Sequence, residues 1–152
     1  MSCIHLTCNN RKVNPWTPLA THVFYVYTTL DVKSPENIEK YKNLQKLKES
    51  EILEQNCQKS IVCEFQETEG ITCVLLETVA KEFSLDHEFR CRWITLKVHS
   101  SLEAVGLTAE FAKVLTETEI SCNVIAGFYH DHIFVGVDQA ERAVQVLKSL
   151  SK

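Results

Sequence analysis

The sequence has few residues that interrupt regular structure and no long apolar stretch. Only four glycines and three prolines occur among its 152 residues, which disfavours long flexible linkers. No apolar run approaches the roughly 18–20 residues that cross a bilayer, so we predict no membrane partner. The segment Met1–Trp16 is polar and lacks the apolar core of a signal peptide. A cytoplasmic protein is therefore expected.

An excess of basic charge is also missing. The chain has 16 Lys and Arg residues against 20 Asp and Glu residues, a formal net charge of −4. Nucleic-acid binding needs a basic face that neutralises phosphates, so we predict no nucleic-acid partner. Hydrophobic residues make up 45% of the sequence, which is typical of one globular domain or two small ones.

Paired cysteine motifs are absent, although seven cysteines occur. None of them forms a C-x-x-C pair, and Cys63, Cys73 and Cys122 lie inside apolar, strand-like runs. A thiol in such a run behaves as a small buried hydrophobe. Reduced cysteines in the cytosol are the simplest interpretation.

The first half begins with a polar segment over residues 1–20. The aromatic and β-branched run His22–Thr28 predicts a strand. Ser34 before Pro35 then predicts the start of a helix. A solvated amphipathic helix is the plainer interpretation of the stripe that follows, and partner binding through it is the alternative. The stripe consists of Ile38, Tyr41, Leu44 and Leu47.

Two further apolar runs, Ile61–Phe65 and Ile71–Leu76, predict a hairpin. Glu77–Leu85 is typical of a helix. The polar stretch Asp86–Cys91 is the best candidate for a domain boundary.

The second half begins with Trp93–His99, which alternates apolar and polar residues as a strand does. Ser100 and Glu103 match the S-x-x-E capping box that starts a helix. The expected apolar face of this helix, at a period of 3.6 residues, contains Ala104, Leu107, Thr108, Phe111, Ala112 and Leu115.

Two strands, Ser121–Gly127 and His132–Val137, are expected next, joined by a turn at Phe128–Asp131. Asp138 and Glu141 are expected to cap a last helix. The resulting order, β-α-β-β-α, predicts an α+β sheet with both helices on one face. The core residues expected on the last helix are Ala140, Ala143, Val144 and Leu147.

The run Trp93–Val135 closely resembles a family of small tandem ACT-domain proteins. The likeness is carried by VHSSLEAVGLTA, by NVIAG and by YHDHIFV. Phe24–Thr28 and Glu69–Leu76 (EGITCVLL) resemble the amino-terminal module of that family more weakly. The charged segment Asp31–Lys59 departs from the family pattern, so its role is not inherited.

The resemblance implies a ferredoxin-like βαββαβ fold in two tandem modules packed together, often with strands shared between the copies. We expect a degenerate module over 21–88, with a charged insertion at about 31–59, and a second module over 89–152. ACT domains generally bind amino acids or similar metabolites and pass the occupancy to an enzyme or partner. The expected function is therefore a non-enzymatic regulatory or sensor protein with a small-molecule ligand. Its further partners would be a homo-oligomer or a regulated protein. The alternative is a protein-protein interaction module without a small ligand.

One candidate ligand site is the turn where the strand ending at His99 leads into the next helix. Unpaired N–H groups at a helix start attract an anion such as a carboxylate. Gly106 would allow a ligand or another backbone to approach closely. The alternative is that Ser100 only caps the helix and Gly106 only permits tight packing. The candidate residues here are His99, Ser100, Ser101, Val105 and Gly106.

A second candidate group is His130, Asp131 and His132, together with Asn123. A turn stabilised by Asp131 is the plainer interpretation; ligand contact and zinc ligation, with His99 as a further ligand, are the alternatives. A histidine pair of this kind could titrate near neutrality. Asn123 is expected on the face opposite Cys122, where its amide could orient a ligand. Neither a metal nor a cofactor is predicted.

Catalytic motifs are weak. The four glycines are isolated, and no G-x-S-x-G elbow occurs. Cys91, between Arg90 and Arg92, is the only cysteine with cationic neighbours, which a reactive thiol needs. The two arginines could instead hold a carboxylate or pair with Glu82 or Glu88. An enzyme is therefore not expected.

Overall fold

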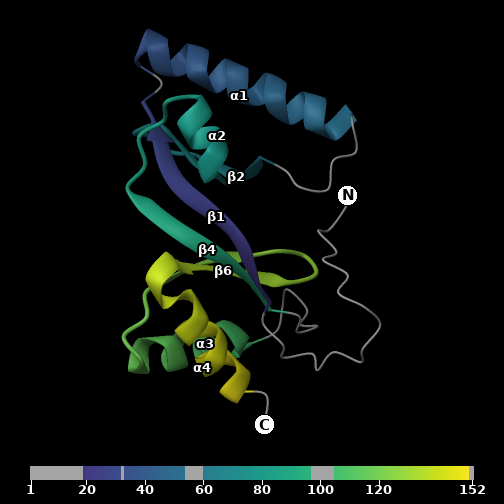
Figure 1. Cartoon of the computed structure of the whole chain (residues 1–152), viewed down its shortest axis with the longest axis vertical. Helices are drawn as coiled ribbons and strands as arrows, with labels where there is room; N and C mark the ends of the chain where they lie inside the picture. Colours follow the sequence, from purple (N-terminus) through teal and green to yellow (C-terminus); the bar gives the residue numbers. More distant parts are fainter. Residues whose placement is uncertain (1–18, 32, 54–59, 97–104, 151–152) are drawn as a thin grey trace. The chain divides into compact units, whose positions relative to one another are not determined.

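The computed structural model describes residues 19–31, 33–53, 60–96 and 105–150. The chain divides into two compact units (Figure 1). Of the described residues, unit 1 contains 25–31, 33–53 and 60–90, and unit 2 contains 19–24, 91–96 and 105–150. The α+β fold that the element order predicts is confirmed.

Unit 1 follows the order β-α-β-β-α. Its strands have the order β2-β3-β1, and both pairs are antiparallel. The hairpin and the two helices expected in this half are present. The elements are β1 (Leu19–Leu30), α1 (Pro35–Leu53), β2 (Ile61–Gln66), β3 (Ile71–Leu76) and α2 (Glu77–Glu82).

Unit 2 repeats the order, with strands in the order β4-β6-β5 and antiparallel pairing. α1 therefore holds in unit 1 the place in chain order that α3 holds in unit 2. β1 and β4 each contribute residues to both units. The elements are β4 (Phe89–Leu96), α3 (Leu107–Glu117), β5 (Cys122–Ala126), β6 (Asp131–Gly136), the 3-10 turn η1 (Val137–Gln139) and α4 (Ala140–Ser149).

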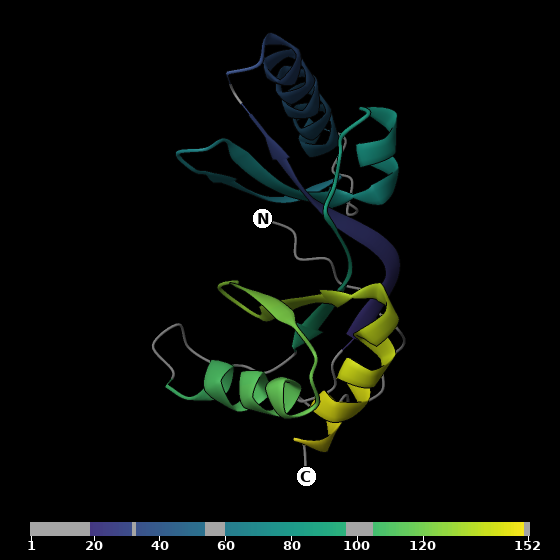
Figure 2. The ribbon, with the colours of Figure 1, turned by 90° about the vertical axis from the view of Figure 1, so that its left-hand side faces the viewer.

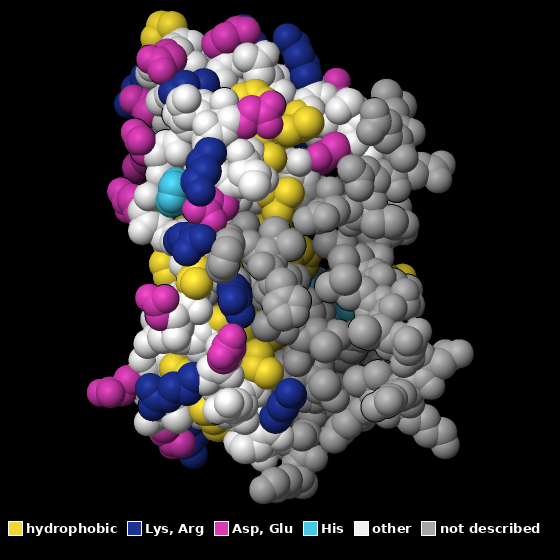
Figure 3. Space-filling view, viewed as in Figure 1, with side chains coloured by type: hydrophobic (Ala, Val, Ile, Leu, Met, Phe, Trp, Pro, Cys, Tyr) yellow, Lys and Arg dark blue, Asp and Glu magenta, His cyan; other side chains and the backbone are white. Residues whose placement is uncertain are grey.

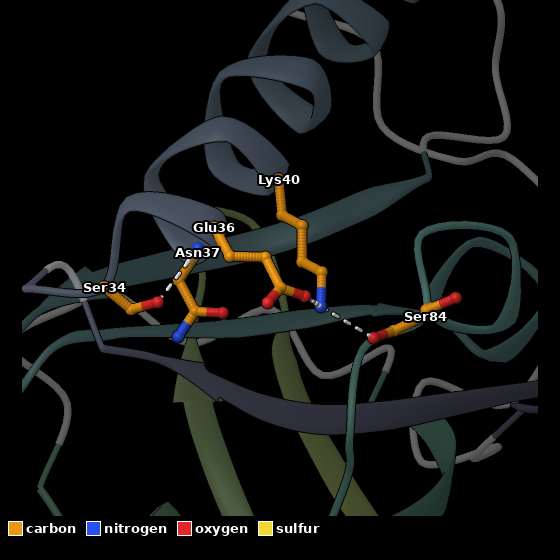
Figure 4. A network of polar contacts seen from close by, with 5 residues as sticks. All are labelled: Ser34, Glu36, Asn37, Lys40 and Ser84. Carbon is orange, nitrogen blue, oxygen red and sulfur yellow. Dashed lines mark hydrogen bonds and ion pairs between the residues drawn. The ribbon is translucent and has the colours of Figure 1, made fainter.

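The start of α1 is capped as expected. Ser34 Oγ accepts a hydrogen bond from the backbone N–H of Asn37 at 3.5 Å (Figure 4). One turn further on, Lys40 Nζ lies 2.8 Å from Glu36 Oε1 and donates to the Ser84 carbonyl at 3.2 Å. Lys40 thus connects the first turns of α1 to the residues that follow α2.

Polar contacts also attach the middle of α1 to β2. Glu64 accepts hydrogen bonds from Gln45 Nε2 at 2.7 Å and from Lys48 Nζ at 3.0 Å. Leu44 is fully buried, whereas Ile38 at the end of the predicted stripe is 37% exposed. The predicted amphipathic helix is therefore confirmed, but its apolar contact is narrow.

The core of unit 2 is apolar and lies on the side of the strands that carries α3 and α4 (Figure 2). Of the residues expected on the last helix, Ala140, Ala143 and Leu147 are buried and Val144 is partly buried. Thr108, expected on the buried face of α3, is exposed. The core cluster consists of Ile94, Leu96, Phe111, Leu115, Ile120, Ile133, Val135, Ala140, Ala143 and Leu147.

The predicted cap of the last helix by Asp138 is wrong. η1 runs directly into α4, and the N-cap residue Gln139 makes no side-chain capping bond. The N–H of Ala140 instead donates to the Val137 carbonyl. The 3-10 turn thus supplies a backbone acceptor for an N–H group at the start of the helix, where the side chain of Asp138 was expected to be the acceptor.

Surface charge in the described part of the chain is mixed. Figure 3 shows Lys and Arg side chains interspersed with Asp and Glu side chains on the face it draws. In the described ranges, no helix is both long and apolar enough to cross a membrane.

Candidate ligand site

The β5–β6 hairpin positions the second group of candidate residues. Its turn is closed by a 3.0 Å hydrogen bond from the Gly127 N–H to the His130 carbonyl. Asp131 is the first residue of β6 and pairs with Leu96, the last residue of β4. Because the strands are antiparallel, the hairpin turn and the end of β4 lie at the same end of unit 2. Asp131 belongs to the strand, and a backbone bond closes the turn that it was expected to stabilise.

The register of β4, β5 and β6 divides their residues between two faces. Residues directly opposite one another share a face, and successive residues alternate. Ile94 and Ile133 face the helices, so their neighbours in sequence lie on the other face. That opposite face carries Trp93, Thr95, Asn123, Ile125, His132 and Phe134.

His132 is the centre of a polar cluster on this face. Trp93 Nε1–H donates to His132 Nδ1 at 2.9 Å, and Thr95 Oγ1 lies 3.2 Å from the same nitrogen. The Trp93 and His132 rings meet edge to face, with centroids 5.0 Å apart. An indole nitrogen can only donate, so Nδ1 is the acceptor and the ring proton resides on Nε2.

Burial keeps this imidazole neutral. Burial, and to a lesser extent the neighbouring His130, lowers the pKa of His132 to about 4. The expectation of a histidine pair that titrates near neutrality is therefore wrong for His132. The low-dielectric surroundings disfavour the imidazolium, and a ring nitrogen that accepts the Trp93 proton cannot also bind one.

Asn123 lies on the face opposite Cys122, as its place in the strand predicts. It is exposed and pairs with Phe134, whereas Ile125 pairs with His132. Asn123 and His132 are thus diagonal neighbours on one face, about 7–8 Å apart by the usual strand geometry.

The start of α3 differs from the prediction. Gly106 is the N-cap residue, with φ 107°, and the helix begins at Leu107. The expected placement of Gly106 one turn inside a helix is wrong, because a left-handed φ cannot continue a right-handed helix. Val105 is completely exposed. The other candidates here, His99, Ser100 and Ser101, lie outside the described residues, as do the capping-box residue Glu103 and Ala104.

The two arginines near the start of β4, Arg90 and Arg92, are paired within the protein. Arg90 contacts Glu77 Oε2 through Nε and Nη2, both at 3.0 Å. Arg92 Nη1 lies 3.8 Å from Glu141 Oε1. The expected partners, Glu82 and Glu88, are wrong: both arginines pair with carboxylates, but these belong to Glu77 and Glu141.

Cys91, the one cysteine with cationic neighbours in the sequence, does not have the properties of a nucleophile. Its side chain is fully buried, and burial raises the pKa of the thiol to about 12. Burial also raises the pKa of Cys63 to about 11 and that of Cys73 to about 12. These three cysteines are therefore protonated thiols at neutral pH. This agrees with the prediction that they are reduced and behave as small hydrophobic side chains.

A metal site has no support in the part of the chain that is described. Within it, no group of three His, Cys, Asp or Glu side chains is arranged to hold a metal ion. His99, the further zinc ligand considered above, lies outside the described residues.

Sequence reasoning missed three residues that shape this face, namely Trp93, Thr95 and Gly127. A Cβ atom at Gly127 would lie 2.7 Å from the His130 carbonyl oxygen and 3.2 Å from His132 Nε2. Glycine is therefore required by close packing of the turn. A buried tryptophan usually finds an acceptor for its indole N–H, and this was the available signal for Trp93.

Fold and site together describe a protein with two ferredoxin-like α+β units and a candidate small-molecule site on one face of the second. Two profiles of the ACT domain match the chain, one over residues 16–92 and the other over residues 88–149. The chain belongs to the ACT domain family. No curated protein sequence matches it.

Several solved structures have a similar fold. A protein of unknown function from Vibrio cholerae, described as a possible transport protein, is 40% identical, with a TM-score of 0.67 and coverage of 87% of this chain and 86% of that one. The regulatory subunit of aspartate kinase from Thermus flavus has a TM-score of 0.59 at 7% identity, over 90% and 97% of the two chains.

E. coli aspartokinase III, solved with aspartate and ADP, has a TM-score of 0.58 at 13% identity. The match covers 87% of this chain and 32% of the aspartokinase. The two kinase proteins are too distant in sequence to show more than the shared fold.

Proposed function

We propose that this chain is a non-enzymatic ACT-type regulatory protein that binds an amino acid through unit 2. The observation that carries the proposal is the match of both halves of the chain to the ACT domain. ACT domains generally bind small molecules. Two of the similar folds belong to aspartate kinases, one of them solved with the amino acid aspartate.

The residues of unit 2 support a polar contact surface for such a ligand. His132 and Thr95 are half-buried, and Asn123 is exposed on the same face. A ligand with a carboxylate can accept hydrogen bonds from imidazole and amide N–H groups. The proposed site also includes the remaining candidate residues, namely His99, Ser100, Ser101, Val105, Gly106, His130 and Asp131.

The buried thiols support a non-enzymatic role. A nucleophilic cysteine needs a lowered pKa and access to substrate. The pKa of Cys91 is raised and its side chain is buried. We also propose a cytoplasmic location, which suits a protein with reduced cysteines.

A thermal-shift screen with each of the twenty amino acids tests the proposal. A ligand at one hundred times its Kd adds ~2.7 kcal/mol of stability by mass action. For a chain of this length that corresponds to a rise in Tm of roughly 5–10 °C. The matched control is the amide of the stabilising amino acid, which lacks the carboxylate and should shift Tm less. If none of the twenty raises Tm above the scatter of buffer alone, the proposal fails.

A second function, assembly through strand edges, is favoured by apolar side chains on the outer strands. β2 and β5 are the terminal strands of their units. Phe65 on β2 is 47% exposed and Val124 on β5 is 37% exposed. Exposed edge strands can pair with other chains. Light scattering after size exclusion would show an oligomer if this function holds, and a monomer at micromolar concentration would exclude self-assembly.

A further inference from the structure

Three observations single out the unused nitrogen of His132. Trp93 and Thr95 both contact Nδ1, so the proton is on Nε2. Within the described part of the chain, no group accepts a hydrogen bond from Nε2–H, and both polar neighbours of the ring contact Nδ1. Gly127 lies close to Nε2, because a Cβ atom at this position would be 3.2 Å from the nitrogen, and as a glycine it adds no side chain there.

The surroundings of Nε2 become more open toward β5. Trp93 and Phe134 are buried, His132 is half-buried and Asn123 is exposed. The imidazole is therefore held through Nδ1 by Trp93, and its Nε2–H group lies next to the hairpin turn at Gly127. A rigid donor of this kind loses little conformational freedom when it binds an acceptor.

We infer that Trp93 is a positioning residue that holds His132 as a neutral Nε2–H donor, and that this donor binds a carboxylate oxygen of the ligand. The inference rests on the proposed function and assigns the contact that recognises the ligand. A neutral donor has no acceptor to offer an ammonium group, so the ligand's amino group binds elsewhere. Asn123, diagonal to His132, is the neighbouring polar group for the second carboxylate oxygen.

The first experiment examines the tautomer without any ligand. Two-bond ¹H–¹⁵N spectra of the protein at pH 7 separate protonated from unprotonated ring nitrogens. We expect His132 with a proton on Nε2 alone. In the Trp93→Phe variant, which keeps an aromatic ring but loses the indole N–H, we expect a mixture of both tautomers. A wild-type His132 with its proton on Nδ1, or with both nitrogens protonated, overturns the inference.

The second experiment follows the same signals while each of the twenty amino acids is added. The amino acid that raises Tm should move the His132 Nε2–H signal. If an amino acid raises Tm and leaves His132 unchanged, this inference fails while the proposed function stands. If no amino acid raises Tm or moves the signal, both fail together.

Affinity measurements on variants complete the test. His132→Gln keeps a donor and an acceptor in one amide, whereas His132→Leu keeps neither. We expect the leucine variant to bind at least about tenfold more weakly, the loss typical of one hydrogen bond, and the glutamine variant to recover part of that loss. His87→Gln, at an exposed histidine of unit 1, is the matched control and should bind as wild type. Equal losses in the two His132 variants contradict the inference, and the spectra of the wild type decide it if a variant does not fold.

Discussion

Unit 1 and unit 2 share one chain order but bury polar groups in different places. In unit 1, polar contacts connect α1 to β2 and to the residue before it. Glu64 on β2 accepts from Gln45 and Lys48, and Glu51 on α1 accepts from the N–H and hydroxyl of Ser60. In unit 2, the helices pack on a cluster of apolar side chains. A polar cluster around His132 lies on the opposite face.

The comparison teaches that one topology can be stabilised in two ways. α1 buries Leu44 fully and adds polar contacts with unit 1 through Lys40 and Gln45. α3 buries Phe111 and Leu115 completely. In unit 2 the apolar helix interface lies on one face of the strands, and the candidate residues His132 and Asn123 lie on the other.

The largest effect is expected from removing the apolar core of unit 2. Phe111→Ala deletes a fully buried ring, and such a change costs about 3–5 kcal/mol of unfolding free energy. Urea unfolding followed by fluorescence measures the loss. Lys113→Ala, at an exposed position of the same helix, is the control and should cost little. A cost below about 1 kcal/mol for Phe111→Ala would show that apolar packing does not stabilise unit 2.

A smaller, pH-dependent effect is expected in unit 1. A hydrogen bond from Lys81, together with the bonds and charge of Arg90, lowers the pKa of Glu77. Such a carboxylate stabilises the fold above its unfolded pKa of about 4.3, and the contribution is lost as pH falls through the lower, folded-state value. Glu77→Gln should cost about 1 kcal/mol at pH 7, since solvent screens the partly exposed cations.

The acid-unfolding profile checks the sign of this effect. The difference in stability between wild type and Glu77→Gln should shrink as the pH drops below about 4. The pH dependence of Phe111→Ala, by contrast, should follow wild type, because that variant changes no titrating group. A Glu77→Gln difference that stays constant down to pH 2 would contradict the assigned ion pairs.

The smallest effect is expected from the polar attachment of α1. Lys48→Ala removes the 3.0 Å contact with Glu64 and should cost about 0.5 kcal/mol, because the lysine is 37% exposed. In 1 M salt, where the Debye length is about 3 Å, the difference from wild type should nearly vanish. Lys46→Ala, on the exposed side of the same helix, is the matched control. An undiminished effect at high salt would mean that Lys48 acts through packing of its alkyl chain.

The elements were predictable because their signals are local. Alternation in β4, the apolar run of β3 and Ser34 before Pro35 each depend on a few neighbouring residues. The start of α3 was not predictable in this way: Ser100 and Glu103 match a capping box, yet α3 begins at Leu107, after the N-cap residue Gly106 with φ 107°. Local propensity is compatible with several first residues for a helix, and the tertiary structure determines which of them is used.

For the candidate site, sequence reasoning identified His132 and Asn123 but could not predict that the two side chains lie on the same face of the sheet. His132 and Asn123 share a face because of the register between β5 and β6. Trp93 lies 39 positions before His132 in sequence and yet donates to its Nδ1. A contact between residues so far apart in sequence produces no periodic pattern that could be recognised in a single sequence.

By itself, the sequence determined the order of strands and helices, the apolar faces of α3 and α4 and the membership of both halves in one family pattern, because propensity and periodicity act between near neighbours. Only the tertiary structure decided that Cys91 is buried, that Arg92 meets Glu141 and that Trp93 sets the tautomer of His132. Burial and hydrogen-bond geometry depend on strand register and on side chains far apart in the chain, and these exist only once the protein is folded.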